Sequence, residues 1–321
     1  MRGLSERFRK NLQNGLLSSI LERIKNDSTL CLGIRNNYIN VYYRGGNLMR
    51  IKEKKNNYEI NFDDKYCAGK KSKIINALPK VIHRAEEAQR WVDAVPLLKE
   101  VMDYWFSENP KDEREFQQIV LRENNSSAIG SSTDYFIIDI EYDNHEGARF
   151  DMVAIKWDSN GICRKLQGGY KPRLSFIEMK YGDNALSGSA GILKHIDDFK
   201  KYVNNHRISD IQNEMLTVFR QLRELKLIPA LQGNPNEVKE FSNDTEYLFI
   251  LANHDPSSRK VQDALNMMAE ECRKKILGFA IKFCVSNFLG YGLYNENVFS
   301  LNDFKERYSR QIYSKNKICN S

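Results

Sequence analysis

Charged residues interrupt three runs of apolar residues in the middle of the chain. A carboxylate inside a buried strand is costly unless it is paired with a cation or binds a metal ion. Oxygen ligands are those that Mg²⁺ prefers, so several carboxylates at one point predict a site for Mg²⁺, with Mn²⁺ as its substitute. The charged residues are Asp139 and Glu141 in the run 135–142, Asp151 in the run 149–157, and Glu178 and Lys180 in the run 174–181.

The chemistry that this set predicts is hydrolysis of a phosphodiester. Alternate residues of a strand share a face, so Glu178 and Lys180 point the same way. A hairpin that pairs Asp139 with Asp151 would put both on one face, with Glu141 next on that face. Bound Mg²⁺ lowers the pKa of a water molecule and stabilises charge on a phosphate. Lys180 could position the water, stabilise the developing charge or act as a base.

The apolar patterns also predict the elements that carry these residues. Short connections between the first three strands favour an antiparallel meander, and a strand that follows a crossover helix can add in parallel. The expected fold is therefore a mixed β-sheet flanked by helices. The predicted elements are a helix over 112–123, strands over 135–142, 149–157 and 174–181, helices over 192–204 and 208–225, a strand over 246–252 and a helix over 258–286.

This arrangement resembles the PD-(D/E)XK nuclease superfamily, over about residues 112–255. The resemblance rests on Asp151 and on the tripeptide Glu178-Met179-Lys180, inside the order helix–strand–strand–strand–helix–strand. It implies a restriction-endonuclease-like core in which Asp151 and the glutamate of the tripeptide bind the metal and its lysine is catalytic. Some members add a glutamate from the first core helix, for which Glu115 is the candidate here. Members of the superfamily act in restriction, repair and phage defence.

The tripeptide pattern Glu-x-Lys is not specific by itself, since it occurs elsewhere in the chain. Only the copy ending at Lys180 closes an apolar strand, follows an aspartate-bearing strand and precedes a glycine turn and a helix. The proline of the family name is absent, because Phe150 precedes Asp151. The superfamily tolerates this variation. The alternative is an inactive scaffold that binds nucleic acid or a partner, in which Glu178 pairs with Lys180, or Arg149 with Asp151.

The first hundred residues predict helices around a small sheet. Apolar residues at every fourth position predict one amphipathic helix over 4–25, whose stripe packs either on its own domain or on a second copy. Short aromatic and branched runs predict an antiparallel meander over 30–62. Gly45-Gly46 is the expected two-residue hairpin turn, because glycine accepts positive φ at both positions. A helix is expected over 78–106, with a break at Pro96.

The charge is unevenly distributed between the two expected domains. Residues 1–110 hold 20 Lys and Arg against 13 Asp and Glu, so the whole net charge of +7 lies in this segment. We therefore expect a basic N-terminal module over 1–108, and a nuclease-like domain with a helical C-terminal extension over 109–321. A basic surface favours a polyanionic partner, although a solvated face is the alternative.

Basic side chains in both domains are candidates for binding nucleic acid. Lys52, Lys54 and Lys55 decorate the meander, and Lys194 and His195 open the helix after the third strand. Contacts to phosphate carry no base information, so these residues leave DNA and RNA open. The resemblance favours DNA. A homodimer is expected if both strands of a duplex are cut, since each cut commonly uses its own active site.

Composition excludes several other classes of protein. The six cysteines form no C-x-x-C pair, so neither structural zinc nor a disulfide framework is expected. No run of apolar residues approaches the length of a transmembrane helix, and the start of the chain lacks the apolar core of a signal peptide. The expected location is the cytoplasm, with no membrane partner.

Overall fold

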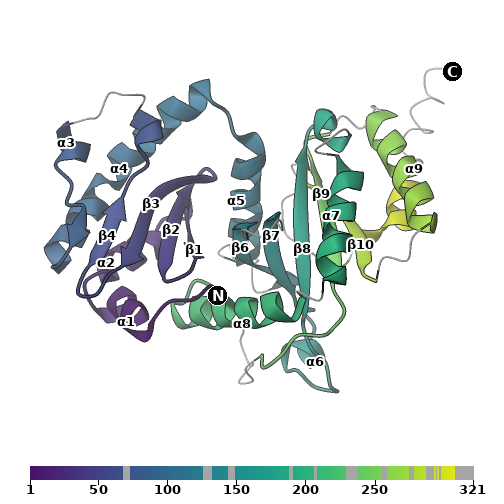
Figure 1. The fold of residues 1–321 in the computed structure, drawn as a ribbon, viewed down its shortest axis with the longest axis horizontal. Coiled ribbons are helices and arrows are strands. Elements are labelled where there is room, and N and C mark those ends of the chain that lie inside the picture. Colours follow the sequence, from purple (N-terminus) through teal and green to yellow (C-terminus); the bar gives the residue numbers. More distant parts are fainter. Residues whose placement is uncertain are drawn as a thin grey trace. The chain divides into compact units, whose positions relative to one another are not determined.

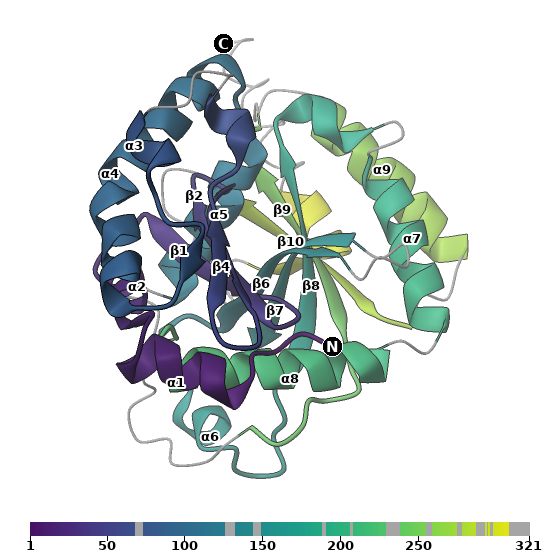
Figure 2. The same ribbon diagram turned by 60° about the vertical axis from the view of Figure 1, so that its left-hand side comes forward.

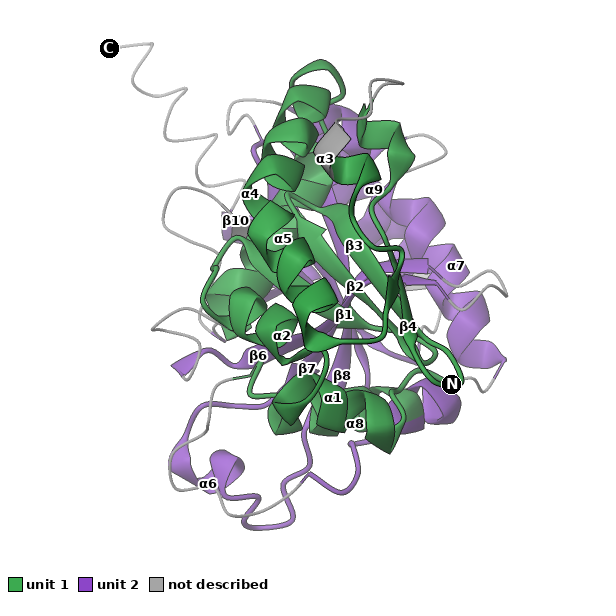
Figure 3. Cartoon of the chain, turned by 90° about the vertical axis from the view of Figure 1, so that its left-hand side faces the viewer, with its two compact units in different colours: residues 1–128, 214–230 green, residues 129–213, 231–321 purple. Residues whose placement is uncertain are grey.

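The chain has a mixed α/β fold with two sheets flanked by helices (Figure 1), as expected from the sequence. It divides into two compact units, coloured separately in Figure 3. Unit 1 comprises residues 1–128 and 214–230, and unit 2 comprises residues 129–213 and 231–321. The computed structural model describes residues 1–67, 73–125, 132–143, 149–187, 191–205, 208–228, 238–254, 259–274, 278–286, 293, 295 and 298–307.

Unit 1 is built on an antiparallel sheet in the order β1-β2-β3-β4-β5. Its first four strands confirm the meander predicted over 30–62. In β4, Tyr58 and Ile60 are buried whereas Glu59 and Asn61 are exposed, which is the alternation of a sheet with one face packed on a core. The strands are β1 (Leu30–Ile34), β2 (Tyr38–Tyr43), β3 (Gly46–Glu53), β4 (Tyr58–Asn61) and β5 (Val81–Ile82).

The turn between β2 and β3 lies one residue earlier than predicted. Tyr43 pairs with Gly46, so the two turn residues are Arg44 and Gly45, with φ of 49° and 70°. Positive φ at both central residues is the signature of a type I′ turn. Gly46 belongs to the strand instead, because its Cα faces a crowded core: a Cβ there would lie 2.5 Å from the Tyr66 hydroxyl.

The predicted helix over 4–25 is in fact two helices, α1 (Glu6–Asn14) and α2 (Ser18–Lys25). Gly15 ends α1 in a non-helical conformation, with its N–H donating to the carbonyl of Asn11. The apolar stripe nevertheless packs as one surface inside unit 1, which answers the question of what covers it. Its buried residues are Leu4, Phe8, Leu12, Leu17, Ile20, Leu21 and Ile24.

Helix α4 (Ala85–Glu108) starts later than predicted and is not broken at Pro96. The helix begins where the Glu87 carboxylate accepts hydrogen bonds from the backbone N–H groups of His83 and Arg84. Pro96 lies on the exposed side, and the buried face continues past it, so packing compensates for the missing hydrogen bond. The short helix α3 (Lys73–Asn76) precedes it.

The predicted domain border near residue 109 does not coincide with the boundary between the units. Helix α5 (Asp112–Asn125) belongs to unit 1, because Gln118 donates to the carbonyls of Thr29 and Tyr42 and accepts from the Gly45 N–H. The later part of α8 (Ile208–Glu224) also belongs to unit 1. There Gln221 forms a pair of hydrogen bonds with the backbone of Leu4.

Unit 2 is built on a mixed sheet in the order β11-β10-β9-β8-β7-β6. Figure 2 labels β6 to β10 of this sheet. The first three strands form the predicted antiparallel meander, and β9 pairs in parallel with β8, also as predicted. The strands are β6 (Tyr135–Asp143), β7 (Arg149–Lys156), β8 (Arg173–Tyr181), β9 (Glu246–Ala252), β10 (Ala280–Ser286) and β11 (Phe299–Ser300).

The helix predicted over 258–286 is wrong in its second half. Helix α9 (Arg259–Lys274) ends early, and the chain returns as β10, which runs parallel to β9. Phe283 of β10 is fully buried and stacks on Phe249 of β9, with ring centroids 5.5 Å apart. A short apolar run satisfies either a buried strand or a buried helix, and pairing with β9 selects the strand.

The remaining helices of unit 2 are α6 (Gly161–Arg164), α7 (Ile192–Asn204) and the first turns of α8. Helices α7 and α9 pack against each other (Figure 2). Phe199 of α7 stacks on Tyr247 of β9 with ring centroids 4.5 Å apart, which fixes α7 against the sheet. In the described part of the chain, none of the helices has the length and apolar character to cross a membrane.

Candidate active site

Two predicted site residues, Asp151 and Glu178, lie on neighbouring strands of unit 2. In the antiparallel pairing of β7 with β8, Met152 lies opposite Ile177. The Asp151 side chain adds a further bond between the two strands. Its Oδ2 accepts a hydrogen bond of 2.7 Å from the backbone N–H of Met179. This bond holds the Asp151 carboxylate against β8, level with the backbone that carries Glu178.

Lys180 and Glu178 form a buried ion pair on the same strand. The distance from Lys180 Nζ to Glu178 Oε1 is 2.9 Å, and the side chains are only 5% and 6% exposed. The predicted sharing of one face is therefore confirmed. A buried charge requires a partner, and each of these two side chains supplies one for the other.

His195 completes this group from helix α7. Its Nε2 lies 2.9 Å from Lys180 Nζ and 3.2 Å from Glu178 Oε1. A neutral imidazole with its proton on Nδ1 accepts a hydrogen bond from Lys180, whereas an imidazolium donates one to Glu178. The sequence analysis counted His195 among the residues that bind nucleic acid. Its observed contacts make it a partner of the lysine and the glutamate.

The predicted pairing of Asp139 with Asp151 is wrong. Asp139 lies opposite Val153, because a β-bulge between Ile137 and Asp139 adds one residue to β6. The same bulge brings another acidic residue of the strand into register. Ile140 lies opposite Met152 and Tyr142 opposite Phe150, so Glu141 between them is level with Asp151.

The backbone at Glu141 is unusual for a residue in a strand. Its φ is 50°, in the left-handed region that residues other than glycine adopt only at a cost. Glu141 is half-buried. Asp139, in contrast, is almost fully buried, with 2% of its surface exposed. Of the three acidic residues of β6, Asp139, Glu141 and Asp143, Glu141 is level with Asp151 and therefore stays a candidate ligand by register, as predicted from the sequence.

Glu115, the glutamate predicted to join the site from the first core helix, lies in unit 1. Both of its carboxylate oxygens accept hydrogen bonds from the Arg44 guanidinium, at 3.1 and 3.0 Å. The same guanidinium binds Asp103 at 2.9 Å. These bonds raise the pKa of Arg44, with Glu115 the main cause. Within unit 1, Glu115 thus acts as half of an ion pair.

The lysines predicted to bind nucleic acid differ in their surroundings. Lys194 contacts both carboxylate oxygens of Asp198, at 2.6 and 2.7 Å, and Lys54 lies 3.0 Å from Glu59. Lys52 and Lys55 are exposed and form no ion pair with any described residue. The backbone carbonyls of Lys54 and Lys55 accept hydrogen bonds from Arg7.

The donor set at Asp151 and Glu178 fits Mg²⁺ in type and in number. Carboxylate oxygens are its preferred protein ligands, and Mg²⁺ is usually held by one or two carboxylates together with water and substrate phosphate. Among the described residues, no group of three or more His, Cys, Asp or Glu side chains is arranged to hold a metal ion. A metal at this point would therefore depend on two carboxylates, with water or substrate completing its shell.

A buried aromatic residue, Tyr247, lies close enough to the carboxylates to feel their charge. Tyr247 of β9 is fully buried, which is the main reason that its pKa lies well above the usual value. The negative charges of Glu178 and Asp151 raise that pKa further. Tyr247 therefore stays a neutral phenol, and it provides an apolar floor that strengthens electrostatic interactions at the site.

A second histidine, which is not among the predicted site residues, lies beside the site. His254 follows β9, and its Nε2 lies 3.2 Å from the Lys180 carbonyl oxygen while its Nδ1 lies 2.9 Å from Asp183 Oδ1. The residue types of the segment Asn253-His254-Asp255 are typical of a turn, which explains them more simply than a metal cluster does. Asp255 lies outside the described residues. The sequence signal that could have identified His254 is its position just after β9. The carboxyl ends of parallel strands meet at one edge of a sheet, so a residue there lies near the end of β8.

Comparisons with known proteins find no relative of this chain. No protein-family model matches the chain, and no match is found among curated proteins or among solved structures.

Proposed function

We propose that unit 2 is a metal-dependent nuclease that hydrolyses phosphodiester bonds of nucleic acid, with DNA as its substrate. What supports the proposal is the grouping of Asp151, Glu178 and Lys180 on two neighbouring strands. Two carboxylates beside a lysine suit a reaction in which a polyanionic phosphate gains charge. The restriction-endonuclease resemblance stated for the sequence points to the same reaction, and to cytoplasmic roles such as phage defence.

The proposed roles follow from the contacts of each side chain. Asp151 and Glu178 would hold Mg²⁺, and Mn²⁺ would substitute for it. The bound ion supplies an activated water and neutralises charge on the phosphate. Lys180 Nζ can donate a hydrogen bond to the attacking water or to a phosphate oxygen, and Glu178 and His195 hold it in place.

A cleavage assay tests the proposal. The substrates are supercoiled plasmid, linear duplex DNA, single-stranded DNA and RNA, each with Mg²⁺, Mn²⁺ or EDTA. Lys180→Ala is the test variant, and Lys10→Ala is the matched control, because Lys10 is paired with Glu6 on an exposed helix face and is not a predicted site residue. Cleavage that requires metal, disappears in Lys180→Ala and persists in Lys10→Ala supports the proposal. Equal cleavage by both variants contradicts it.

A catalytically inactive scaffold that binds nucleic acid is the second candidate. The observation that favours it is the internal pairing of the site, since Glu178 Oε1 already accepts a hydrogen bond from Lys180. This candidate predicts salt-sensitive binding of nucleic acid without cleavage in any metal. Titration with Mn²⁺ separates the two. Asp151→Asn lowers the Mn²⁺ affinity of a metal-dependent nuclease, whereas a scaffold whose carboxylate is occupied by lysine binds the ion equally weakly before and after the change.

The proposed endonuclease is expected to cut duplex DNA as a homodimer. Each strand of a duplex needs its own attack, and the two attacks of a double-strand cut commonly use two active sites. The apolar stripe of α1 and α2 is buried within unit 1 and is not the surface for this pairing. Light scattering of the protein with and without a duplex measures the assembly directly.

A further inference from the structure

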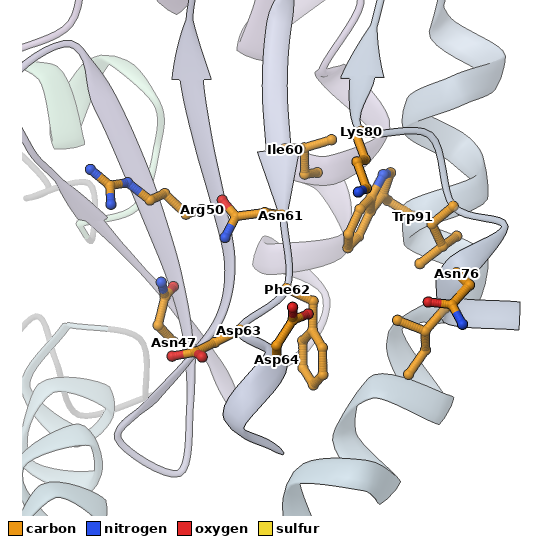
Figure 4. A pocket seen from close by; sticks show the side chains of 12 residues that line it. Asn47, Arg50, Ile60, Asn61, Phe62, Asp63, Asp64, Asn76, Lys80 and Trp91 are labelled. Atoms are coloured by element: carbon orange, nitrogen blue, oxygen red, sulfur yellow. The ribbon is translucent and has the colours of Figure 1, made fainter. Parts of the chain in front are cut away.

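A pocket in unit 1 lies apart from the chemistry considered so far. Its volume is about 540 Å³, within the range of small-molecule sites in proteins. It is formed by β3, by β4 and the turn that follows it, by the segment before β5, and by α4 (Figure 4). Its lining residues are Asn47, Arg50, Ile60, Asn61, Phe62, Asp63, Asp64, Ile75, Asn76, Leu78, Lys80 and Trp91.

Most polar side chains of this pocket form no hydrogen bond or ion pair with the part of the chain that the structure describes. No described residue forms a hydrogen bond or ion pair with the side chains of Asn47, Arg50, Asn61, Asn76 or Lys80. The Asn47 Oδ1 atom is even hidden from solvent without a partner. A buried polar atom such as this one is usually satisfied. Arg50, Asn61, Asn76 and Lys80 are exposed, so water can satisfy them, and the pocket offers these groups together to a polar ligand that replaces the water.

The charges define which ligand fits. Arg50 and Lys80 are cations without a described carboxylate partner, whereas Asp63 is paired with Lys65 at 3.0 Å. Asp64, the other carboxylate of the lining, also has an interaction within the protein. Arg50 also lies over the Tyr38 ring, 4.2 Å from its centroid, which orients the guanidinium. The unpaired charge of the lining is therefore positive, and it favours an anionic group such as phosphate.

The two cations stand on opposite sides of β4. Arg50 pairs in the ladder with Asn61 on one side, and on the other side the Ile60 N–H donates to the Lys80 carbonyl at 3.0 Å. Figure 4 shows the same order, with Asn61 between Arg50 and Lys80. A ligand that engages both cations must carry negative charge at two separated points.

The uncharged residues of the lining favour a flat ligand that carries both hydrogen-bond donors and hydrogen-bond acceptors. Each asparagine amide offers a donor and an acceptor, the pattern that matches the edge of a nucleobase. Trp91 is almost fully buried, and its Nε1 donates to the Pro79 carbonyl at 2.8 Å, so its ring adds apolar surface. Ile60 and Leu78 extend this apolar surface.

We propose that this pocket binds one nucleotide unit, with its base beside the asparagine amides and a phosphate at each of Arg50 and Lys80. A nucleotide within a single strand has phosphate on both its 5′ and its 3′ side, which matches two separated cations. A free nucleoside 3′,5′-bisphosphate has the same chemistry. The inference concerns unit 1 alone, goes beyond the proposed nuclease activity and does not depend on it.

The test is equilibrium binding by the full chain in EDTA, so that any cleavage is suppressed. The probes are adenosine 3′,5′-bisphosphate, adenosine 5′-monophosphate and a fluorescent single-stranded oligonucleotide. The variants are Arg50→Ala and Lys80→Ala. Lys111→Ala is the matched control, because Lys111 is an exposed cation of unit 1 that is outside the pocket and has no described carboxylate partner. Circular dichroism confirms that each variant is folded.

The bisphosphate is expected to bind at least about tenfold more tightly than the monophosphate, since loss of one charged hydrogen bond costs about this factor. Arg50→Ala and Lys80→Ala should each weaken bisphosphate binding by about tenfold, and Lys111→Ala should not change it. Displacement of the oligonucleotide by the bisphosphate identifies a strand as a source of the ligand. If the oligonucleotide binds but is not displaced, the free nucleotide is the source.

Two results would overturn the proposal. One is the absence of bisphosphate binding at millimolar concentration. The other is binding that Arg50→Ala and Lys80→Ala leave unchanged, or that Lys111→Ala weakens equally. Neither result bears on cleavage by unit 2, which is measured with metal present and with Lys180→Ala as its test variant.

Discussion

Lys180 Nζ lies 2.9 Å from Glu178 Oε1, and this ion pair is buried in unit 2. The pair lies on one strand, two residues apart, where the alternation of side chains puts both on the same face. Removal of one partner from a buried pair leaves an uncompensated charge, which destabilises a protein strongly. Variants at either position therefore change stability as well as chemistry.

Glu178→Ala is expected to lower the free energy of unfolding by about 3–5 kcal/mol, because it leaves Lys180 buried without its carboxylate partner. The double variant Glu178→Gln, Lys180→Met removes both charges and should cost less than the sum of the single changes Glu178→Gln and Lys180→Met. Urea unfolding of the wild type, the two single variants and the double variant measures this coupling. Additive losses would show that the ion pair is not an energetic unit.

His195→Ala is expected to lower metal-dependent cleavage by about 10–100-fold without abolishing it, since His195 orients Lys180 and Glu178 from outside the metal shell. His195→Gln should restore part of the rate, because its amide can still accept a hydrogen bond from Lys180. The free energy of unfolding should change little, as 27% of the His195 side chain is exposed. An unchanged rate in His195→Ala would refute this positioning role.

Lys52→Ala and Lys55→Ala are each expected to weaken nucleic-acid binding and to reduce the slope of log K against log salt by about 1. Lys54→Ala should have a smaller effect, because Lys54 already lies 3.0 Å from Glu59. Fluorescence anisotropy over about 50–200 mM salt gives the slopes. Identical slopes in all three variants and the wild type would mean that the meander face does not contact phosphate.

Glu53→Gln is expected to destabilise unit 1 by about 1–2 kcal/mol near neutral pH, because Glu53 accepts charged hydrogen bonds. Burial raises the pKa of Glu53, but hydrogen bonds from Ser5, Asn37 and Arg7 outweigh it, so the pKa is lowered below 4.5. A lowered folded-state pKa stabilises the protein above the unfolded-state pKa, and this stability is lost as pH falls through the folded value.

The difference between wild type and Glu53→Gln should therefore shrink as the pH is lowered below 4.5, the ordinary pKa of glutamate. Urea unfolding at a series of pH values measures this difference. A difference that stays constant or grows in acid would contradict the sign of the shift.

Gly45→Ala is expected to destabilise unit 1 by about 1–3 kcal/mol, because Gly45 has φ of 70° and an added Cβ would lie 2.5 Å from the backbone of Arg114. Gly161→Ala is the control, since no atom lies within 4 Å of a Cβ at that position. Thermal unfolding of both variants provides the comparison. A Gly45→Ala protein as stable as the control would mean that the turn relaxes at no cost.

The sequence alone determined the local elements whose pattern is short-ranged. The meander over 30–62, the three strands with acidic residues and the parallel strand over 246–252 are each encoded by alternation, branched residues and turn signals. The shared face of Glu178 and Lys180 needs only the period of a strand. For the same reason, the buried charge of this pair could be anticipated before the fold was known.

Tertiary packing decided the features that depend on distant residues. The bulge in β6 places Asp139 opposite Val153 and Glu141 level with Asp151, because one extra residue shifts every later side chain of β6 by one position along β7. Residues 280–286 became a strand because β9 offered an unpaired edge. An apolar run of that length has no periodicity that could have made the choice in advance.

The candidate site shows the same division. Its carboxylates and lysine come from strands that the sequence predicts, but His195 and His254 reach Lys180 from elements far along the chain. Glu115 was expected from the first core helix, and Arg44 of unit 1 binds its carboxylate instead. Sequence patterns determine secondary structure because they act over a few residues, whereas the partner of a charged side chain is decided by which elements pack beside it.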